Sequence, residues 1–284
     1  MTNEFNIKTE DNSWCPGCGN FMILKGMEEV LSENGYQPKD VLFVSGIGQA
    51  AKMPHYINGN GYNTLHGRAL PSAMGAHLAN SDLLTIVNTG DGDNYSEGGN
   101  HFLHAIRRNM NIVHLIHDNQ VYGLTKGQGS PTTPKGRATS VYAGGVRIDE
   151  INPIESAIAI GATFVARTFS NDLEHFKQTM KAAIEHDGYA IVDILQPCPS
   201  FNKVNTFSWY KERVYKIEET HNPYDKMAAY KLAQQFGDEG VPIGIIYKDD
   251  SKESYLKRLP HIKKPLIRYE TDYSVLDEVF ESFI

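Results

Sequence analysis

The stretch Gly90-Asp91-Gly92-Asp93 follows an apolar run, Leu83–Thr89, that is typical of a buried β-strand. An amphipathic segment comes next, and a second apolar run, Asn111–His117, leads into Asp118-Asn119. Strand, glycine-rich turn, helix and strand in this order predict a parallel sheet. Consecutive parallel strands place their carboxyl ends side by side, so we expect Asp91 and Asn119 to meet at one edge of the sheet.

The residue types at these two strand ends suit a diphosphate that is held by a metal ion. Mg²⁺ prefers hard oxygen ligands in a near-octahedral array and usually combines a few protein groups with phosphate oxygens. Asp91 offers a carboxylate, Asn119 offers an amide oxygen, and the backbone carbonyl of Val121 can fill a third protein position. Gly90 and Gly92 let the backbone turn and approach the phosphates without a Cβ in the way.

Helix and strand alternate along most of the chain, which predicts an α/β fold with a doubly wound, mostly parallel sheet and helices on both faces. The expected elements are helix Asn20–Leu31, strand Val41–Ser45, helix Ser72–Ala79, strand Leu83–Thr89, helix Gly98–Arg108, strand Ile112–His117, helix Pro153–Ile160, strand Ala162–Ala166, helix Asp172–His186 and strand Tyr189–Leu195. A long glycine-rich loop, Tyr122–Arg137, is expected to be functional.

The periodicity weakens after residue 196. We therefore predict one domain over residues 1–196, which carries the diphosphate site and an N-terminal Cys-x-x-Cys turn. Residues 197–284 are expected to form a C-terminal extension that packs on this core or on a partner subunit. Within the extension we expect a helix at Lys226–Phe236 and a strand at Pro242–Tyr247.

Composition excludes several classes of protein. The net charge is −7 and no basic run appears, which argues against a nucleic-acid partner. The N-terminal stretch Met1–Asn12 is polar, and no apolar run approaches the length needed to cross a membrane, so we expect a cytoplasmic protein without a membrane partner. Three cysteines, two of them in a Cys-x-x-Cys pair, suit metal or cluster ligation in a reducing compartment better than disulfides.

Longer motifs surround the two strand ends. They are Trp14-Cys15-Pro16-Gly17-Cys18-Gly19, Val44-Ser45-Gly46-Ile47-Gly48, His66-Gly67-Arg68-Ala69-Leu70-Pro71, Gly98-Gly99-Asn100-His101, Arg107-Arg108-Asn109 and the run from Asp118 to Gln128. Together they resemble the thiamine diphosphate-binding beta subunits of 2-oxoacid:ferredoxin oxidoreductases, over nearly the whole chain from about Trp14 to about Tyr247.

The resemblance implies an activity and a set of partners. The reaction would be a reversible, coenzyme A-dependent oxidative decarboxylation of a 2-oxoacid, with 2-oxoglutarate favoured, to acyl-CoA, carbon dioxide and reduced ferredoxin. The glutamate that activates the cofactor would lie on a pyrimidine-binding module in a separate alpha subunit. The expected partners are therefore this alpha subunit and ferredoxin, in a heterodimer or a dimer of heterodimers.

The resemblance also assigns residues to the cofactor site. With thiamine diphosphate bound through Mg²⁺ at Asp91, Asn119 and Val121, the expected contacts are Ser45, Gly46, Ile47, Gly48, His66, Gly67, Gly90, Asp91, Gly92, Asp93, Asn119, Val121, Tyr122, Gly123, Leu124 and Thr125. His66 is expected near the reacting centre. Lys52 and Lys126 are the two cations that we expect near an anionic substrate.

The cysteines match the family except at one position. The resemblance implies that Cys15, Cys18 and Cys198 are ligands of a [4Fe–4S] cluster, with a fourth cysteine after the Ser-Gly-Ile-Gly segment, but this chain has Gln49 there. The cluster can take an atypical fourth ligand from solvent, the backbone or Gln49. It can instead be a three-iron form, or the cysteines can form a zinc site or remain free buried thiols.

Two other functions stay open from the sequence. A subunit of a non-redox thiamine diphosphate enzyme, such as a decarboxylase or a transketolase-like protein, would keep the Asp91 site and needs no cysteines near the cofactor. Gln49 is the feature of the sequence that most favours this alternative. A zinc-bearing or regulatory binding protein would use the fold without catalysis.

Overall fold

The computed structural model describes residues 3–7, 12–217, 220–270 and 273–284, so residues 1–2 and 8–11 of the polar N-terminal stretch lie outside the described residues. The strands are β1 Val41–Ser45, β2 Asn60–Asn63, β3 Leu84–Gly90, β4 Ile112–Asp118, β5 Phe164–Phe169, β6 Tyr189–Leu195, β7 Val214–Lys216 and β8 Val241–Lys248. The helices are α1 Asn20–Glu33, α2 Ala69–Ala79, α3 Gly99–Arg108, α4 Pro153–Ile160, α5 Leu173–Glu185, α6 Phe207–Arg213, α7 Lys226–Ala233 and α8 Val275–Glu281.

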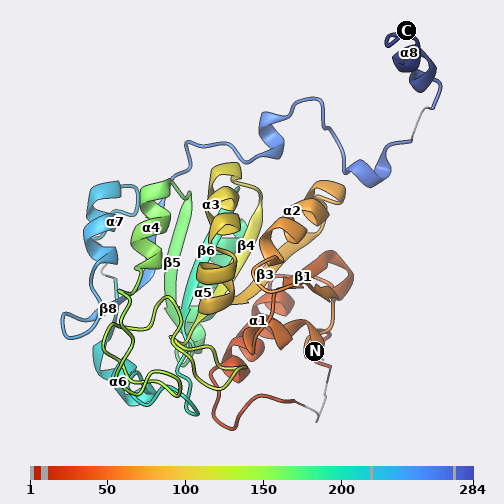
Figure 1. The fold of residues 1–284 in the computed structure, drawn as a ribbon. Coiled ribbons are helices and arrows are strands. Elements are labelled where there is room, and N and C mark those ends of the chain that lie inside the picture. Colours follow the sequence, from red (N-terminus) through yellow and green to blue (C-terminus); the bar gives the residue numbers. More distant parts are fainter. Residues whose placement is uncertain (1–2, 8–11, 218–219, 271–272) are drawn as a thin grey trace.

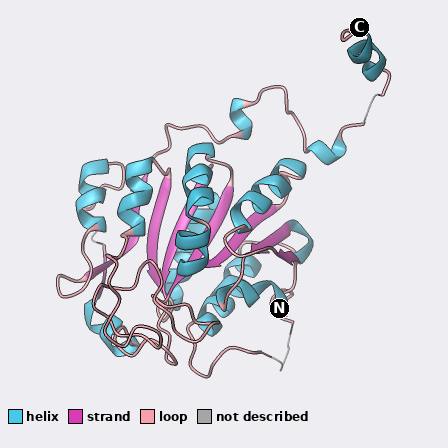
Figure 2. Cartoon of the chain, viewed as in Figure 1, coloured by secondary structure: helices cyan, strands magenta, loops and turns pink. Residues whose placement is uncertain are grey.

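All eight strands lie in one sheet, in the order β2-β1-β3-β4-β6-β5-β8-β7 (Figures 1 and 2). Every pairing is parallel except that of β8 with β5. Strand side chains alternate between the two faces. Phe43 and Ile86 pack with the core residues of α1 and α5, whereas their neighbours Val44 and Val87 pack with those of α2, α3 and α4. The predicted doubly wound fold is confirmed.

Several element boundaries differ from those expected. Strand β2 was not predicted, because Asn60–Asn63 is polar, exposed and glycine-containing and so lacks an apolar alternation. Strand β5 begins at Phe164 rather than Ala162, because Gly161 ends α4 in a left-handed conformation at φ 98° and the turn takes up the next two residues. Helix α3 begins at Gly99 and is preceded by a π-helical turn, Asp93–Glu97.

The chain beyond residue 197 enters the same sheet. Strand β8 pairs with β5, and β7 adds to β8 at the edge. A small apolar cluster formed by Phe169, Leu195, Tyr210, Val241 and Ile243 joins the two parts of the chain. Strands β7 and β8 therefore extend the central sheet, so the chain on both sides of the predicted division at 196/197 contributes strands to it.

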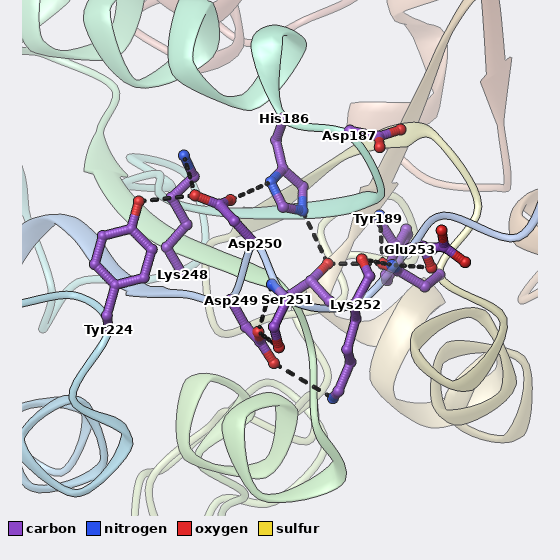
Figure 3. A network of polar contacts seen from close by, with 12 residues as sticks. His186, Asp187, Tyr189, Tyr224, Lys248, Asp249, Asp250, Ser251, Lys252 and Glu253 are labelled. Atoms are coloured by element: carbon purple, nitrogen blue, oxygen red, sulfur yellow. Dashed lines mark hydrogen bonds and ion pairs between the residues drawn. The ribbon is translucent and has the colours of Figure 1, made fainter. Parts of the chain in front are cut away.

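A polar network fixes the course of the chain after β8, at the sheet edge where β5 and β6 begin (Figure 3). The Asn109 Oδ1 atom accepts hydrogen bonds from Thr163 Oγ1 at 2.6 Å and from the Tyr189 amide at 2.9 Å. Its Nδ2 donates to the Glu253 carbonyl at 3.2 Å. Beyond this point the chain runs away from the sheet and ends in α8 (Figure 1).

None of the helices in the described ranges combines the length and the apolar character that a bilayer span requires.

Candidate active site

The ends of β3 and β4 bring the two predicted metal ligands to one cavity. The strands are parallel neighbours with Gly90 opposite His117, so Asp91 and Asn119 follow adjacent strand ends, as expected. The cavity measures about 270 Å³ and lies at the sheet edge that carries the long loop 119–152, coloured yellow-green in Figure 1. Its lining residues are Ile47, Gly48, Gln49, Ala50, His66, Gly90, Asp91, Gly92, Asp93, Asn119, Val121, Tyr122, Gly123, Leu124 and Thr125.

Two hydroxyls of the long loop hold the Asp91 carboxylate. Its Oδ2 atom accepts hydrogen bonds from Ser130 Oγ at 2.5 Å and from Thr132 Oγ1 at 2.7 Å. Thr132 also lies 2.8 Å from Asp118 Oδ1. Burial raises the pKa of Asp91 to about 6, and the hydroxyl bonds act in the opposite direction. Sequence reasoning identified the loop as functional but did not identify Ser130 or Thr132.

Asp93 forms hydrogen bonds with two loops beside the cavity, the one after β1 and the one before α2. Its Oδ1 atom accepts hydrogen bonds from the Gly67 amide at 2.7 Å and from the Ile47 amide at 3.2 Å. Gly46 must be glycine, because a Cβ there would lie 2.0 Å from Asp93 Oδ2. Burial raises the pKa of Asp93. Asp93 therefore fixes the relative positions of the segments after β1 and before α2.

Three predicted contact residues support the cavity without being among its lining residues. Gly46 and Gly67 are held against Asp93, as described above. The Ser45 hydroxyl is buried and donates to the Ala51 carbonyl at 2.8 Å, which fixes the loop that leads into residues 47–50. Ser45 thus shapes the site through the backbone.

His66 lies at the wall of the cavity between two carboxylates. Its Nε2 atom is 3.5 Å from Asp93 Oδ1, and its Nδ1 atom is 3.4 Å from Glu97 Oε2. The Tyr122 hydroxyl donates to the same Glu97 carboxylate at 3.2 Å. A Cβ on Gly92 would lie 2.4 Å from the Tyr122 ring, so glycine lets this ring close over the turn. Sequence reasoning gave Glu97 no part in the site.

The two predicted substrate lysines do not line this cavity. Lys52 is half-buried, and its Nζ atom donates to Ser13 Oγ at 2.8 Å. Lys126 is exposed on the loop, where its backbone adopts φ 75°. Their proposed role toward substrate stays a prediction.

The three cysteines come together at a second, smaller cavity of about 20 Å³. Cys15, Cys18 and Cys198 line it together with Gln49. Burial raises the pKa of Cys18 to about 11, so this thiol is neutral unless a cation accompanies it. Within the described ranges, no three His, Cys, Asp or Glu side chains form a group that could hold a metal ion.

The two cavities share a wall. Gln49, Asn119 and Gly123 line both of them. Gln196, which follows β6, connects them further: its Nε2 atom donates to Cys18 Sγ at 3.3 Å, and its Oε1 atom accepts from Asn119 Nδ2 at 3.3 Å. Sequence reasoning did not identify Gln196, because nothing marks it except its place after the last core strand.

The residues present fit the groups that the sequence predicts. Asp91, Asn119 and the Val121 carbonyl are oxygen donors at one cavity, which is the donor set that Mg²⁺ prefers. Gly46 and Gly92 let the Asp93 carboxylate and the Tyr122 ring pack around the cavity at positions where a Cβ would collide with them. The three cysteines at the second cavity are sulfur donors, which is the ligand type that an iron–sulfur cluster uses.

Comparison with known families divides the chain into two matched regions. Residues 44–194 match the thiamine pyrophosphate enzyme, C-terminal TPP binding domain. Residues 198–264 match the C-terminal family of the pyruvate ferredoxin oxidoreductase beta subunit. The first match runs from the end of β1 into β6 and includes the segments that form the Asp91 cavity, and the second begins at Cys198.

Similar proteins extend the match over most of the chain. A 2-oxoacid:ferredoxin oxidoreductase subunit beta from Saccharolobus solfataricus is 45% identical over 266 residues, which cover 89% of this chain and 87% of that protein. The 2-oxoglutarate oxidoreductase subunit KorB from Mycobacterium tuberculosis is 44% identical over 208 residues, which cover 72% of this chain and 56% of that protein.

A solved structure shares the fold. It is a 2-oxoglutarate:ferredoxin oxidoreductase from Magnetococcus marinus with 2-oxoglutarate, coenzyme A and succinyl-CoA bound. The matched chain superimposes with a TM-score of 0.88 at 34% identity, and the match covers 98% of this chain and 99% of that one. Since sequence, family and fold agree, this chain belongs to the family of 2-oxoacid:ferredoxin oxidoreductase beta subunits.

Proposed function

We propose that this chain binds thiamine diphosphate through Mg²⁺ and, with an alpha subunit, catalyses the reversible coenzyme A-dependent oxidative decarboxylation of a 2-oxoacid to acyl-CoA, carbon dioxide and reduced ferredoxin. The observation that carries the proposal is the shared wall between the Asp91 cavity and the three-cysteine cavity. A redox centre that contacts the decarboxylation site is what an oxidative reaction requires.

At the first cavity, Asp91, Asn119 and the Val121 carbonyl would hold the metal ion and, through it, the diphosphate. When bound, thiamine diphosphate supplies the carbanion stabilisation that allows a 2-oxoacid to lose carbon dioxide. Asp93 would keep the loops that contain Ile47 and Gly67 in place around the site, because its carboxylate accepts hydrogen bonds from the backbone amides of both residues. These contacts orient and enclose the cofactor, which is the usual task of the protein in a cofactor enzyme.

His66 is the residue that we expect to act near the reacting atoms. It lines the cavity, and its two ring nitrogens lie 3.5 Å from the Asp93 carboxylate and 3.4 Å from the Glu97 carboxylate. A protonated imidazole can donate a hydrogen bond to a developing negative charge or transfer a proton there. The Glu97 carboxylate between His66 and Tyr122 would hold the ring in place.

The cysteine cavity favours the redox function over a non-redox thiamine enzyme. A decarboxylase or a transketolase-like protein has no need of three thiols at the wall of its cofactor site. A cluster held by Cys15, Cys18 and Cys198 would accept electrons there and pass them to ferredoxin. The Gln196 bridge would couple the two centres, because it contacts Cys18 on one side and Asn119 on the other.

For the substrate we propose 2-oxoglutarate. Relatives that match this chain include proteins named as 2-oxoglutarate oxidoreductase or 2-oxoglutarate synthase subunits, and the similar solved structure contains 2-oxoglutarate. A substrate with two carboxylates needs a cation near the site. Lys52 and Lys126 remain the two candidates from this chain.

The proposed assembly supplies the pyrimidine-binding module, which we expect on a separate subunit. The alpha subunit would bring the pyrimidine-binding module with its catalytic glutamate, in a heterodimer or a dimer of heterodimers. We propose a cytoplasmic location, because ferredoxin and coenzyme A are partners of the reaction.

The test is an assay of the chain purified with its alpha subunit under anaerobic conditions. With 2-oxoglutarate and coenzyme A we expect reduction of ferredoxin or a viologen dye, and less reduction with pyruvate. Asp91→Ala should abolish bound thiamine diphosphate, measured as released thiochrome. Decarboxylation without dye reduction would support the non-redox alternative, and zinc without thiamine would support a binding protein.

A further inference from the structure

We propose that Gln49 is the fourth ligand of the iron–sulfur cluster and binds one iron through its side-chain oxygen, Oε1. The inference rests on the proposed function, which places a cluster at Cys15, Cys18 and Cys198. It goes beyond that function by assigning the position where this chain has no cysteine. All three cysteines are free thiols in the described structure. The sequence contains no fourth cysteine.

The first support is position. Gln49 lines the same small cavity as the three cysteines. It comes from the loop after β1, whereas the cysteines come from the Cys15–Cys18 turn and the segment after β6. The Trp14 indole N–H donates to the Gln49 carbonyl at 2.7 Å, so the backbone of residue 49 is fixed against the cysteine turn. Trp14 is buried and packs edge-on against Phe21 and Tyr56.

The second support is an unused ligand atom. Gln49 Oε1 is buried and finds no hydrogen-bond partner among the described residues. A buried carbonyl oxygen without a partner costs about 1–3 kcal/mol relative to one that is satisfied, so such an atom calls for a partner such as a bound ion or a water molecule. Within this cavity, a bound iron is the partner that the neighbouring thiols imply.

The third support is that Gln49 has no competing structural task. It is the residue before the short helical segment Ala50–His55, but its side chain makes no capping hydrogen bond there. Its Cγ atom lies 3.6 Å from the place of a Cβ on Gly123, which is ordinary contact. The side chain can therefore be replaced without removing an internal hydrogen bond of the described fold.

The choice of ligand has electrostatic consequences. A carboxamide oxygen is neutral, whereas a cysteine thiolate carries one negative charge. A cluster bound by three thiolates and Gln49 is therefore one unit less negative than a cluster with four thiolates, and it is easier to reduce. An oxygen ligand also binds iron less firmly than a thiolate, so the iron at Gln49 should be the first one lost on exposure to oxygen.

The experiment uses the complex with the alpha subunit, reconstituted anaerobically with iron and sulfide. In the wild type we expect about four irons per beta chain, one of them spectroscopically distinct by Mössbauer spectroscopy. Gln49→Ala should lower the count to about three and give the electron paramagnetic resonance signal of a three-iron cluster. Gln49→Cys should restore about four equivalent irons and shift the midpoint potential to a more negative value.

The matched control is Gln178→Ala, on the exposed face of α5, which should leave the spectrum and the potential unchanged. Thermal unfolding of each variant shows whether a lost iron reflects lost folding. A Gln49→Ala protein that keeps four irons with an unchanged spectrum overturns the ligand assignment but leaves the proposed function in place. A wild type that binds zinc or no metal, with Cys18→Ser equally active, overturns both the assignment and the cluster.

Discussion

At the scale of single residues, the site depends on groups that hold the predicted ligands in position. Asp91 is the proposed metal ligand, and Ser130 and Thr132 donate hydrogen bonds to its Oδ2 atom. Ligating carboxylates are usually oriented by hydrogen bonds of this kind, and their loss weakens metal binding. Gly46 acts similarly, since it lets Asp93 approach the backbone that it binds.

Thr132→Val should raise the Mg²⁺ concentration needed for half-maximal activity by about 10- to 100-fold, with a smaller effect on the rate at saturating Mg²⁺. The reason is that valine keeps the shape of threonine but removes the hydroxyl that holds Asp91 Oδ2. A Mg²⁺ titration of activity and of bound thiamine diphosphate measures the change. Thr132→Ser keeps the hydroxyl and should stay near the wild type; equal Mg²⁺ requirements in all three proteins would exclude this role.

Gly46→Ala should weaken thiamine diphosphate binding by about tenfold or more, because the new Cβ would displace Asp93 from the Ile47 and Gly67 amides. Isothermal titration calorimetry with the cofactor and Mg²⁺ measures the effect. Gly75→Ala is the control, since a Cβ at this position in α2 meets nothing within 4 Å. If the two variants bind the cofactor alike, Asp93 does not organise the loops.

At the scale of elements, β4 places two buried histidines behind the site. His114 forms side-chain hydrogen bonds with Thr89 at 2.7 Å and with Tyr189 at 2.6 Å. His117 forms one with Asn20 at 2.8 Å, at the start of α1. Burial lowers the pKa of each histidine to about 3, so both are neutral in the folded chain. These hydrogen bonds join neighbouring elements to β4, the strand that Asn119 follows.

Because the folded pKa is lowered, stability from these histidines is present above pH 6.5 and is lost as the pH falls toward 3. Each histidine should contribute a loss of about 1.4 kcal/mol per pH unit within this window. The raised pKa of the buried Asp91 makes the folded chain more stable as the pH falls, which opposes the effect of the histidines. The contribution of one histidine is therefore measured as the difference between the wild type and a histidine variant. In urea unfolding between pH 6.5 and 5, His114→Gln should show the shallower loss; identical slopes would contradict the prediction.

At the scale of the whole molecule, the body of the chain, up to residue 258, and the C-terminal end, residues 259–284, differ in how closely they pack. The sheet has helices on both faces and carries the site at one edge, while residues after 258 leave it (Figure 1). Arg268 forms an ion pair with Asp82, which follows α2. Helix α8 is short, and apolar side chains are exposed on it and just after it, among them Phe280 at 65% and Phe283 at 84%. A helix of this length is marginal in water without packing.

Removal of residues 259–284 should therefore leave the melting temperature of the body within about 2 °C of the full chain, because few contacts are lost. The shorter chain should also self-associate less, since exposed apolar side chains promote association. Differential scanning calorimetry and size-exclusion chromatography measure the two effects. A clear drop in melting temperature would show that this end packs on the body in solution.

The sequence alone determined the features that depend on neighbours along the chain. Apolar runs that end in Gly90-Asp91-Gly92 and in Asp118-Asn119 sufficed to predict β3, β4, the parallel pairing and the shared edge, because strand periodicity and turn chemistry are local properties. The family motifs added the cysteines and the loop residues that line the two cavities. Strand β2 was not predicted, because its residues are polar and show no strand periodicity. It forms through its pairing with β1, which is a tertiary contact.

Only the tertiary structure decided which residues from distant segments meet. Ser130 and Thr132 reach Asp91 from a loop about 40 residues away in sequence, and Gln196 joins Cys18 to Asn119 across the sheet edge. Hydrogen bonds between such residues leave no periodic trace in the sequence. The placement of Gln49 beside three thiols likewise depends on strand order, which fixes the neighbours of each strand end.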